Sequence, residues 1–251
     1  MPRTYDDLSV IRHDDAEALG RATATRFAEE VRARLATQSS VGVIVQTGGS
    51  QRPFYDALEG IELDWSRIDV FHLDEYVGIP SDHPACFGRW IRERVVERFG
   101  ARTFHAFDSE AGDAAVEAVR YGEVLRSHAP QICVMSVGEQ GQVAFVEPPA
   151  EFATLEPVTI VELAESSRQQ QVRQGFFPCY EDTPAAAWTM TVPALLSCER
   201  VLVTVPERRK AEAVRATLEG SVSRAVPASM LRLCPRAELH LDADAASLLA
   251  G

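Results

Sequence analysis

The sequence of 251 residues predicts an α/β fold with a doubly wound, mainly parallel sheet. Short, almost wholly apolar runs typical of buried parallel strands occur at 41–45, 68–73 and 132–137. The first two runs lead, through a turn with glycine or acidic residues, into a stretch with helical periodicity, and the third run ends at Gly138. In such folds ligands collect at the carboxyl ends of the strands. Because no linker or internal repeat interrupts the pattern, we expect one domain over residues 1–251.

The elements of the first half follow from hydrophobic periodicity. The first expected helix, 14–36, starts at an Asp-Asp pair that can cap it. The further expected elements are a strand at 41–45, a helix at 53–58, a strand at 68–73, a helix at 84–99, a strand at 103–107, a helix at 113–127 and a strand at 132–137.

The pattern weakens in the second half. Polar residues dominate from 148 to about 183, so this segment is either an ordered lid or a surface excursion. Regular alternation returns at 188–192. We then expect a strand at 200–205, a helix at 207–218, a closing edge strand at 239–241 and a short helix after it.

The charge balance argues against several classes of partner. The formal net charge is -12 and the pI is about 5.0, whereas nucleic-acid and anionic-membrane surfaces need clustered lysine and arginine. No run approaches the ~18 apolar residues of a membrane span, and the first residues lack the basic and apolar regions of a signal peptide. We expect a cytoplasmic protein without a nucleic-acid or membrane partner, acting on a small molecule.

No cofactor or metal is expected. The cysteines are scattered without a C-x-x-C or His-paired spacing, which predicts reduced thiols: Cys86, Cys133, Cys179, Cys198 and Cys234. The acidic residues lack a clustered ligand spacing, and the glycine-rich loop is neither a Walker A sequence nor a G-x-G-x-x-G.

The loop Thr47, Gly48, Gly49 and Ser50 joins the first strand to a helix. Paired glycines let backbone N–H groups approach an anion, the helix N-terminus adds partial positive charge, and the hydroxyls donate further hydrogen bonds. This arrangement suits phosphate, although Gly-Gly loops also occur at β-to-α turns that only need positive φ.

Two carboxylates, Asp74 and Glu75, follow the apolar run 68–73. Adjacent residues of an extended chain point to opposite faces, so the two cannot both face one substrate. One of them is therefore the candidate acid or base, unless the pair only belongs to a solvated loop.

Three cations, Arg208, Arg209 and Lys210, stand in the first turn of the helix expected at 207–218. Cations at a helix N-terminus oppose the helix dipole, which indicates a neighbouring anion. The alternative is a solvated basic face.

Several blocks in order resemble the glucosamine-6-phosphate deaminase/isomerase family. They are 45–50, 72–78 with 82–84, 138–149, 167–173, 205–211 and 218–220. The resemblance implies a Rossmann-like three-layer α/β/α sandwich that binds a hexose phosphate, an amino-hexose 6-phosphate above all, at the strand ends. Deaminases of this type are often oligomers, so a homo-oligomer stays open.

The resemblance also implies residue roles. The phosphate would lie against Thr47 to Ser50, with Arg168 or Arg173 from the lid and Lys210 from the helix start. Asp74 matches the family's base, which moves a proton between C1 and C2. Glu147 matches the glutamate beside the family's ring-opening histidine.

One block departs from the family pattern. Gln142 stands at the histidine position, Gln140 at the preceding acid or amide, and Val146 at the asparagine. Glutamine forms hydrogen bonds but does not titrate, and losing a general acid costs about 10²–10⁴-fold in that step. Ordinary ring-opening deamination should be impaired unless Glu147 or Glu139 substitutes. The same change weighs against the lactonase branch of the superfamily, which also uses a histidine there.

Three readings follow, in this order. The first is an enzyme with Asp74 chemistry on a sugar phosphate that is already open-chain or differs at C2. The second is a hexosamine-phosphate deaminase with a rewired acid. The third is a non-catalytic sugar-phosphate sensor, although the roughly 13 residues before the first helix leave no room for a helix-turn-helix segment. A phosphogluconolactonase-type hydrolase ranks lower.

Overall fold

The computed structural model describes residues 3–173 and 175–250, so Gln174 of the expected lid lies outside the described residues. The strands are β1 (Arg3–Tyr5), β2 (Leu8–Arg12), β3 (Val41–Val45), β4 (Ile68–His72), β5 (Asp74–Tyr76), β6 (Thr103–His105), β7 (Ile132–Met135), β8 (Val158–Glu162), β9 (Ala186–Met190), β10 (Arg200–Val205) and β11 (Ala237–Leu241). The α-helices are α1 (Ala16–Leu35), α2 (Arg52–Leu58), α3 (Phe87–Ile91), α4 (Glu97–Phe99), α5 (Ala114–His128), α6 (Glu165–Arg173), α7 (Val192–Leu196) and α8 (Ala211–Glu219).

Shorter helical segments complete the chain. They are η1 (Gly49–Gln51), η2 (Trp65–Arg67), η4 (Arg208–Lys210) and η5 (Pro227–Leu233), all 3₁₀ in type, and the π-helical η3 (Arg92–Val96) between α3 and α4. The helix expected at 84–99 is therefore a run of α3, η3 and α4.

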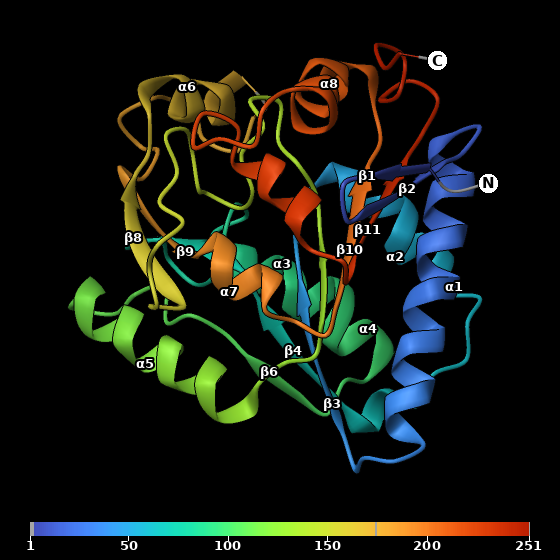
Figure 1. The fold of residues 1–251 in the computed structure, drawn as a ribbon. Helices are drawn as coiled ribbons and strands as arrows, with labels where there is room; N and C mark the ends of the chain where they lie inside the picture. The colour runs from blue at the N-terminus through green and yellow to red at the C-terminus, as the bar shows by residue number, and fades with distance from the viewer. Residues whose placement is uncertain (1–2, 174, 251) are drawn as a thin grey trace.

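The predicted parallel sheet is confirmed. Within the described ranges, eight strands pair in the order β1-β2-β11-β10-β7-β3-β4-β6, and only the β1–β2 pair is antiparallel. The strands expected at 41–45 and 200–205 match β3 and β10 residue for residue. A smaller antiparallel sheet has the order β5-β9-β8 and lies beside the large one (Figure 1).

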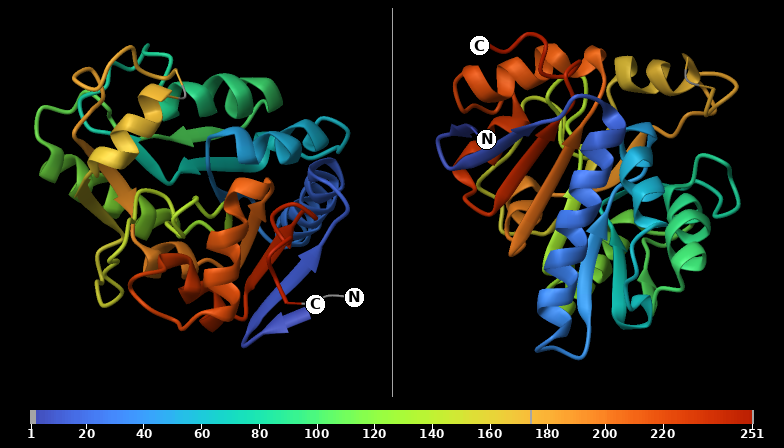
Figure 2. Two further views of the ribbon diagram at one scale, coloured as in Figure 1. Left: turned by 90° about the horizontal axis from the view of Figure 1, so that it is seen from above. Right: turned by 90° about the vertical axis from the view of Figure 1, so that its right-hand side faces the viewer.

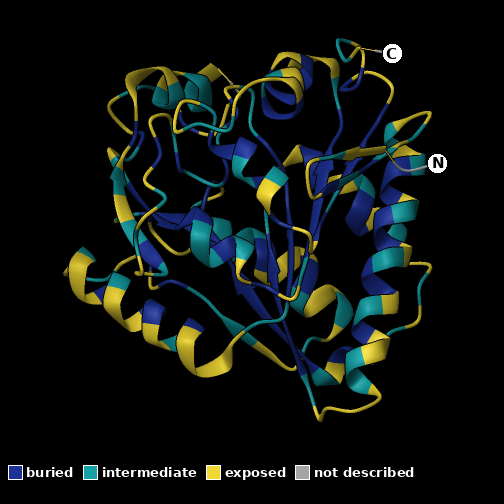
Figure 3. Cartoon of the chain, in the orientation of Figure 1, coloured by how far each residue is buried: buried dark blue, intermediate teal, exposed yellow. Residues whose placement is uncertain are grey.

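Helices cover both faces of the large sheet, which gives the three layers (Figure 2). Apolar residues of α1, α2 and α3 pack on one face and those of α5, α7 and α8 on the other. Every residue of β3, β4 and β7 is buried, as Figure 3 shows for the centre of the molecule. Continuous apolar runs are what a strand covered on both faces requires.

Two expectations for the chain ends are wrong. The strand expected as a closing edge at 239–241 is β11, which pairs with β10 on one side and β2 on the other. The outer position is taken by β1, which the sequence did not reveal. Residues after β11 form turns rather than the expected short helix.

The described residues of the expected lid, 148–173 and 175–183, contain both β8 and α6. β8 alternates between buried or half-buried and exposed side chains, so it lacks the continuous apolar run of a central strand. The described helices include none with the length and apolar character needed to cross a membrane.

The crossing of α1 over α2 depends on Gly20, and α2 follows directly after the glycine loop. A Cβ at position 20 would overlap the backbone carbonyl of Pro53. We expect Gly20→Ala to destabilise the protein by about 1–3 kcal/mol, although alanine favours helix, because overpacking outweighs propensity. Urea unfolding measures the change. Gly112→Ala is the control, since its Cβ would meet open space, and equal stability of both variants contradicts the prediction.

Candidate active site

A cavity of about 480 Å³ lies at the carboxyl ends of β3, β4 and β7, between α6 and the start of α8. Six segments that follow strands or belong to the lid line it. They are residues within 46–52, Asp74, residues within 84–94, residues within 138–145, the lid residues Gln170, Gln171 and Phe176, and the pair Arg209 and Lys210. The topology thus brings segments from most of the chain to the edge where doubly wound folds bind ligands.

Asp74 and Glu75 face different surroundings, as the alternation along β5 requires. Asp74 lines the cavity and is only 5% exposed. Within the described ranges, no hydrogen-bond donor reaches its carboxylate, which makes it an uncompensated buried acid. Burial raises the pKa of Asp74 well above its usual value, and the neighbouring charge of Glu75 raises it further.

Glu75 has the opposite environment, because the first turn of α3 surrounds its carboxylate. It accepts hydrogen bonds from the N–H of Gly88 (2.7 Å), Phe87 (3.2 Å) and Tyr76 (2.9 Å), and from the Cys86 thiol (3.2 Å). Burial nevertheless raises the pKa of Glu75. Its carboxylate holds α3 to β5, and of the two carboxylates it is that of Asp74 that lines the cavity.

The glycine loop adopts the backbone that a small residue permits. Gly48 has φ +102°, a conformation that side chains rarely allow. Thr47, Gly48, Gly49 and Ser50 all line the cavity. The loop therefore lies where the phosphate prediction needs it.

Lys210 reaches this loop from the β10 side. Its Nζ donates to Ser50 Oγ (2.6 Å) and Ser136 Oγ (2.9 Å), and the residue is 5% exposed. Both partners are uncharged hydroxyls, and no carboxylate within the described ranges pairs with its ammonium group. Burial lowers the pKa of Lys210 to about 8. A bound anion would compensate this charge.

The neighbouring Arg209 is already neutralised. Its guanidinium pairs with Glu139 at 2.5 Å and with Glu207 at 2.5 Å. The sequence indicated an anion beside this basic turn. For Arg209, that anion is the pair of protein carboxylates Glu139 and Glu207. This bridge also ties the loop after β7 to the loop after β10, where Glu207 has φ +85°.

The block that departs from the family pattern is partly inside the cavity. Gln142 lines it, and its Oε1 accepts from the backbone N–H of Gln140 at 2.9 Å. Gln140 itself is exposed and does not line the cavity. Glu147 lies outside the lining too: it accepts from the Ser167 hydroxyl and from the Ala164 N–H (3.3 Å).

The lid arginines do not line the cavity. Arg168 donates to the carbonyls of Thr183 and Tyr180, and its guanidinium lies 3.9 Å from the centre of the Tyr180 ring. Arg173 is exposed at the end of α6. The lid contributes Gln170, Gln171 and Phe176 to the lining instead.

Sequence reasoning missed Arg52, Trp90 and Arg94, which also line the cavity. Arg52 directly follows the glycine loop, and this position was the available signal. His72, in β4, is packed: it is 1% exposed and its Nε2 accepts from the Phe107 N–H at 2.8 Å. The described residues contain no cluster of three or more acidic, histidine or cysteine side chains arranged to hold a metal.

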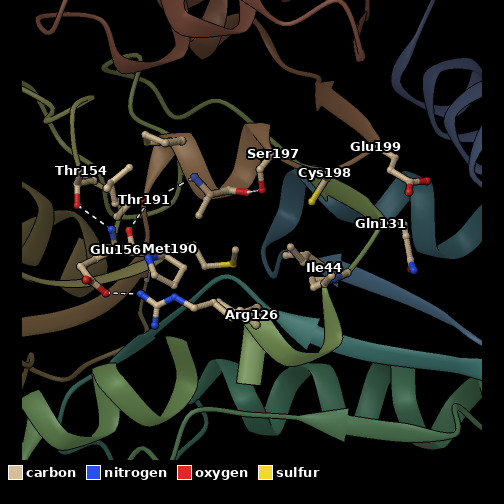
Figure 4. Close-up of a pocket in the computed structure, with 17 residues that line it drawn as sticks. Ile44, Arg126, Gln131, Thr154, Glu156, Met190, Thr191, Ser197, Cys198 and Glu199 are labelled. Carbon is tan, nitrogen blue, oxygen red and sulfur yellow. Dashed lines mark hydrogen bonds and ion pairs between the residues drawn. The ribbon is translucent and has the colours of Figure 1, made fainter. Parts of the chain in front are cut away.

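A second cavity, also about 480 Å³, lies near the amino ends of β7 and β10 (Figure 4). Its lining is largely apolar, with Ile44 and Met190 among the lining residues, and its charged pair, Arg126 and Glu156, is joined at 2.5 Å. It contains none of the residues predicted for the site and lies at the end of the sheet away from the glycine loop.

Comparison with known proteins gives concordant matches. A family model described as glucosamine-6-phosphate isomerases/6-phosphogluconolactonase matches residues 14–240. Glucosamine-6-phosphate deaminases of Bacillus thuringiensis and Bacillus anthracis are each 32% identical over 202 residues, which is 80% of this chain and 76% of theirs.

Solved structures give the same answer. A monomeric glucosamine-6-phosphate deaminase superposes with a TM-score of 0.87 at 28% identity, covering 96% of this chain and 99% of that one. The 6-phosphogluconolactonase of Trypanosoma brucei has a TM-score of 0.79 at 18% identity with full coverage of both chains, which shows a shared fold. Because the family model spans most of the sequence, the chain belongs to the glucosamine-6-phosphate isomerase/6-phosphogluconolactonase family.

Proposed function

We propose that this protein is a sugar-phosphate isomerase/deaminase-like enzyme, with an amino-hexose 6-phosphate as its substrate class. The observation that carries the proposal is one cavity that holds a buried carboxylate, Asp74, and a buried cation, Lys210. Among the described residues, no hydrogen-bond donor reaches the first and no carboxylate pairs with the second. A sugar phosphate offers an anion for the lysine and an acidic C–H for the carboxylate.

Asp74 is the proposed base. On an open-chain 2-amino aldose it takes the proton from C2 and returns it at C1, which gives a 2-imino compound. Water then hydrolyses the imine and releases ammonia. A raised pKa suits this task, because a base whose pKa approaches the working pH accepts a proton more readily than an ordinary aspartate.

Ring opening is the step that the site supports least. Gln142 stands at the histidine position of the family pattern and does not titrate. Glu147 lies outside the cavity lining, and Glu139 is paired with Arg209. We therefore propose that the substrate arrives open-chain or that ring opening is slow, in preference to a rewired acid.

The first test is proton exchange at C2 of glucosamine 6-phosphate and at C1 of fructose 6-phosphate, followed by NMR in D₂O. We expect exchange with the natural protein and a loss of about 10²-fold or more with Asp74→Asn, which removes the base. Exchange that persists in the variant would eliminate Asp74 as the base. Binding without exchange by the natural protein would favour a sugar-phosphate sensor.

Gln142→His tests the ring-opening assignment. A histidine at this position restores a titrating group, so ammonia release from glucosamine 6-phosphate should rise, by about tenfold or more if ring opening limits the rate. Gln142→Asn, which keeps an amide, is the control. No gain in ammonia release would show that more than one residue separates this site from the family's deaminases.

Lys210 makes phosphate binding depend on pH. Only the charged lysine attracts an anion, and its pKa is lowered to about 8. Affinity for glucitol 6-phosphate, an open-chain compound that cannot react, should fall above pH 8 by up to about tenfold per pH unit. Calorimetry between pH 7 and 9.5 measures this. Lys210→Arg should flatten the profile because arginine stays charged, and an unchanged slope in that variant contradicts the assignment.

A further inference from the structure

We propose that the second cavity, the one drawn in Figure 4, is a binding site for a small, uncharged and largely apolar molecule. The inference goes beyond the proposed function, because this cavity contains none of the residues of the candidate active site. It commits to a small molecule as the occupant. A second copy of this chain is the alternative that the experiment distinguishes.

The cavity has the size and shape of a ligand site. Its volume of about 480 Å³ lies within the range of about 300–1,000 Å³ that is usual for small-molecule pockets. Residues at the C-terminal end of α5 line one side and residues of α7 line the other, while the segments 129–131 and 154–157 complete the wall. A concave space enclosed by several segments suits a small molecule.

The polar side chains of the wall are already paired within the protein. Arg126 and Glu156 form an ion pair at 2.5 Å, and Glu199 pairs with Arg34 at 3.1 Å. The uncharged groups bond to the backbone: Gln131 Oε1 accepts from the Gly42 N–H (2.8 Å), Thr154 Oγ1 accepts from the Glu156 N–H (3.1 Å), Thr191 Oγ1 donates to the Glu156 carbonyl (2.9 Å) and Ser197 Oγ donates to the Ala194 carbonyl (2.7 Å). Among the described residues, the wall thus leaves no charge without a partner. A charged ligand would lose its hydration there without gaining an ion pair, which costs free energy.

The remaining surface of the wall is apolar. It comes from Ile44, Leu125, Ala129, Pro130, Leu155, Pro157, Met190, Pro193, Ala194 and Cys198. Water in such a space finds few free hydrogen-bond partners, so an apolar molecule that displaces it gains free energy. Leu155 is 95% exposed, and a bound molecule would cover part of its side chain.

Backbone hydrogen bonds fix the wall before any ligand binds. The Met190 N–H donates to the Leu73 carbonyl (2.8 Å), the Thr191 N–H to the Pro157 carbonyl (3.0 Å) and the Arg200 N–H to the Gln131 carbonyl (3.0 Å). A preformed wall reduces the free energy that binding spends on ordering the protein. The Met190 side chain is unbranched and polarisable, so it can adapt to the shape of an apolar ligand.

The first experiment compares two probes by calorimetry. 2-Naphthol is an uncharged aromatic molecule at pH 7, whereas 2-naphthoate has the same rings and carries a carboxylate. We expect the natural protein to bind 2-naphthol at least about tenfold more tightly, because the paired wall does not compensate a buried carboxylate. Equal affinity for the two probes, or no binding of 2-naphthol, overturns the inference.

Methyl NMR locates the bound probe. The chain has four methionines, and of the described ones only Met190 lines either large cavity. In protein labelled with ¹³C at the methionine methyl groups, 2-naphthol should shift the Met190 signal more than the others, and Met190→Leu assigns that signal. If 2-naphthol binds and the Met190 signal does not move, the site lies elsewhere and the inference is wrong.

A variant that fills the cavity tests the site independently. Ala194→Phe places a ring where the probe would lie and should raise the Kd for 2-naphthol by about tenfold or more. Ala115→Phe, at an exposed alanine of α5, is the matched control and should change the Kd by less than about twofold. Thermal unfolding curves show whether both variants are folded, and the Met190 signal decides the question if Ala194→Phe is not. The same Kd in both folded variants contradicts the assignment.

Sedimentation at several protein concentrations tests the alternative occupant. Without a probe, we expect the Met190 signal to stay unchanged as the protein concentration rises. If the protein dimerises and this signal moves with the dimer fraction, a second copy of the chain covers the cavity. That result overturns the small-molecule assignment.

Discussion

Successive side chains of a strand point to opposite faces, and at Asp74 and Glu75 this constraint organises the centre of the molecule. Glu75 is directed to the first turn of α3, whose N–H groups and the Cys86 thiol satisfy its carboxylate. That contact fixes α3 and the wall that continues to Trp90. Asp74 is directed to the cavity, where no described donor compensates it. The two adjacent carboxylates thus have different roles: Glu75 holds the wall of the cavity, and Asp74 is the base of the proposed enzyme.

The electrostatics of the cavity follow from burial more than from net charge. The chain carries a formal net charge of -12, and Arg209 is offset by Glu139 and Glu207. In the part of the chain that the structure describes, Lys210 has only hydroxyl partners. Burial moves its pKa downwards and that of Asp74 upwards. Both groups are shifted towards their neutral forms, which means that keeping them charged in the empty site costs folding free energy. A ligand with an anion at one end reduces the cost at Lys210 only, so Asp74 keeps its basicity in the complex.

The central sheet could be predicted from the sequence because burial on both faces leaves continuous apolar runs, as in β3 and β10. The outer elements could not. β1 has three residues and no buried one, and β8 alternates in exposure within a polar segment. Three parts of the cavity could be predicted from local sequence patterns: the glycine loop from its paired glycines, Asp74 from its position after an apolar run, and Lys210 from the basic first turn of a helix. The placement of Arg168 carried none, because its partners are backbone carbonyls 12 and 15 residues away, which no side-chain pattern encodes.

The glutamine block is built around Gln142 rather than merely lacking a histidine. The Gln142 amide oxygen accepts from the Gln140 N–H, and a Cβ at Gly138 would overlap the Gln142 side chain. The Gln142 carbonyl also accepts from the Gly138 N–H at 2.9 Å. The loop 138–142 therefore packs around the Gln142 side chain, which stabilises this part of the cavity wall. Because a glutamine amide does not titrate, Gln142 cannot act as a general acid towards a sugar ring oxygen. In the proposed enzyme, proton transfer at C1 and C2 is thus separated from ring opening: the first keeps a buried carboxylate, whereas the second has lost its titrating group. This separation favours a substrate that is already open-chain over a replacement acid.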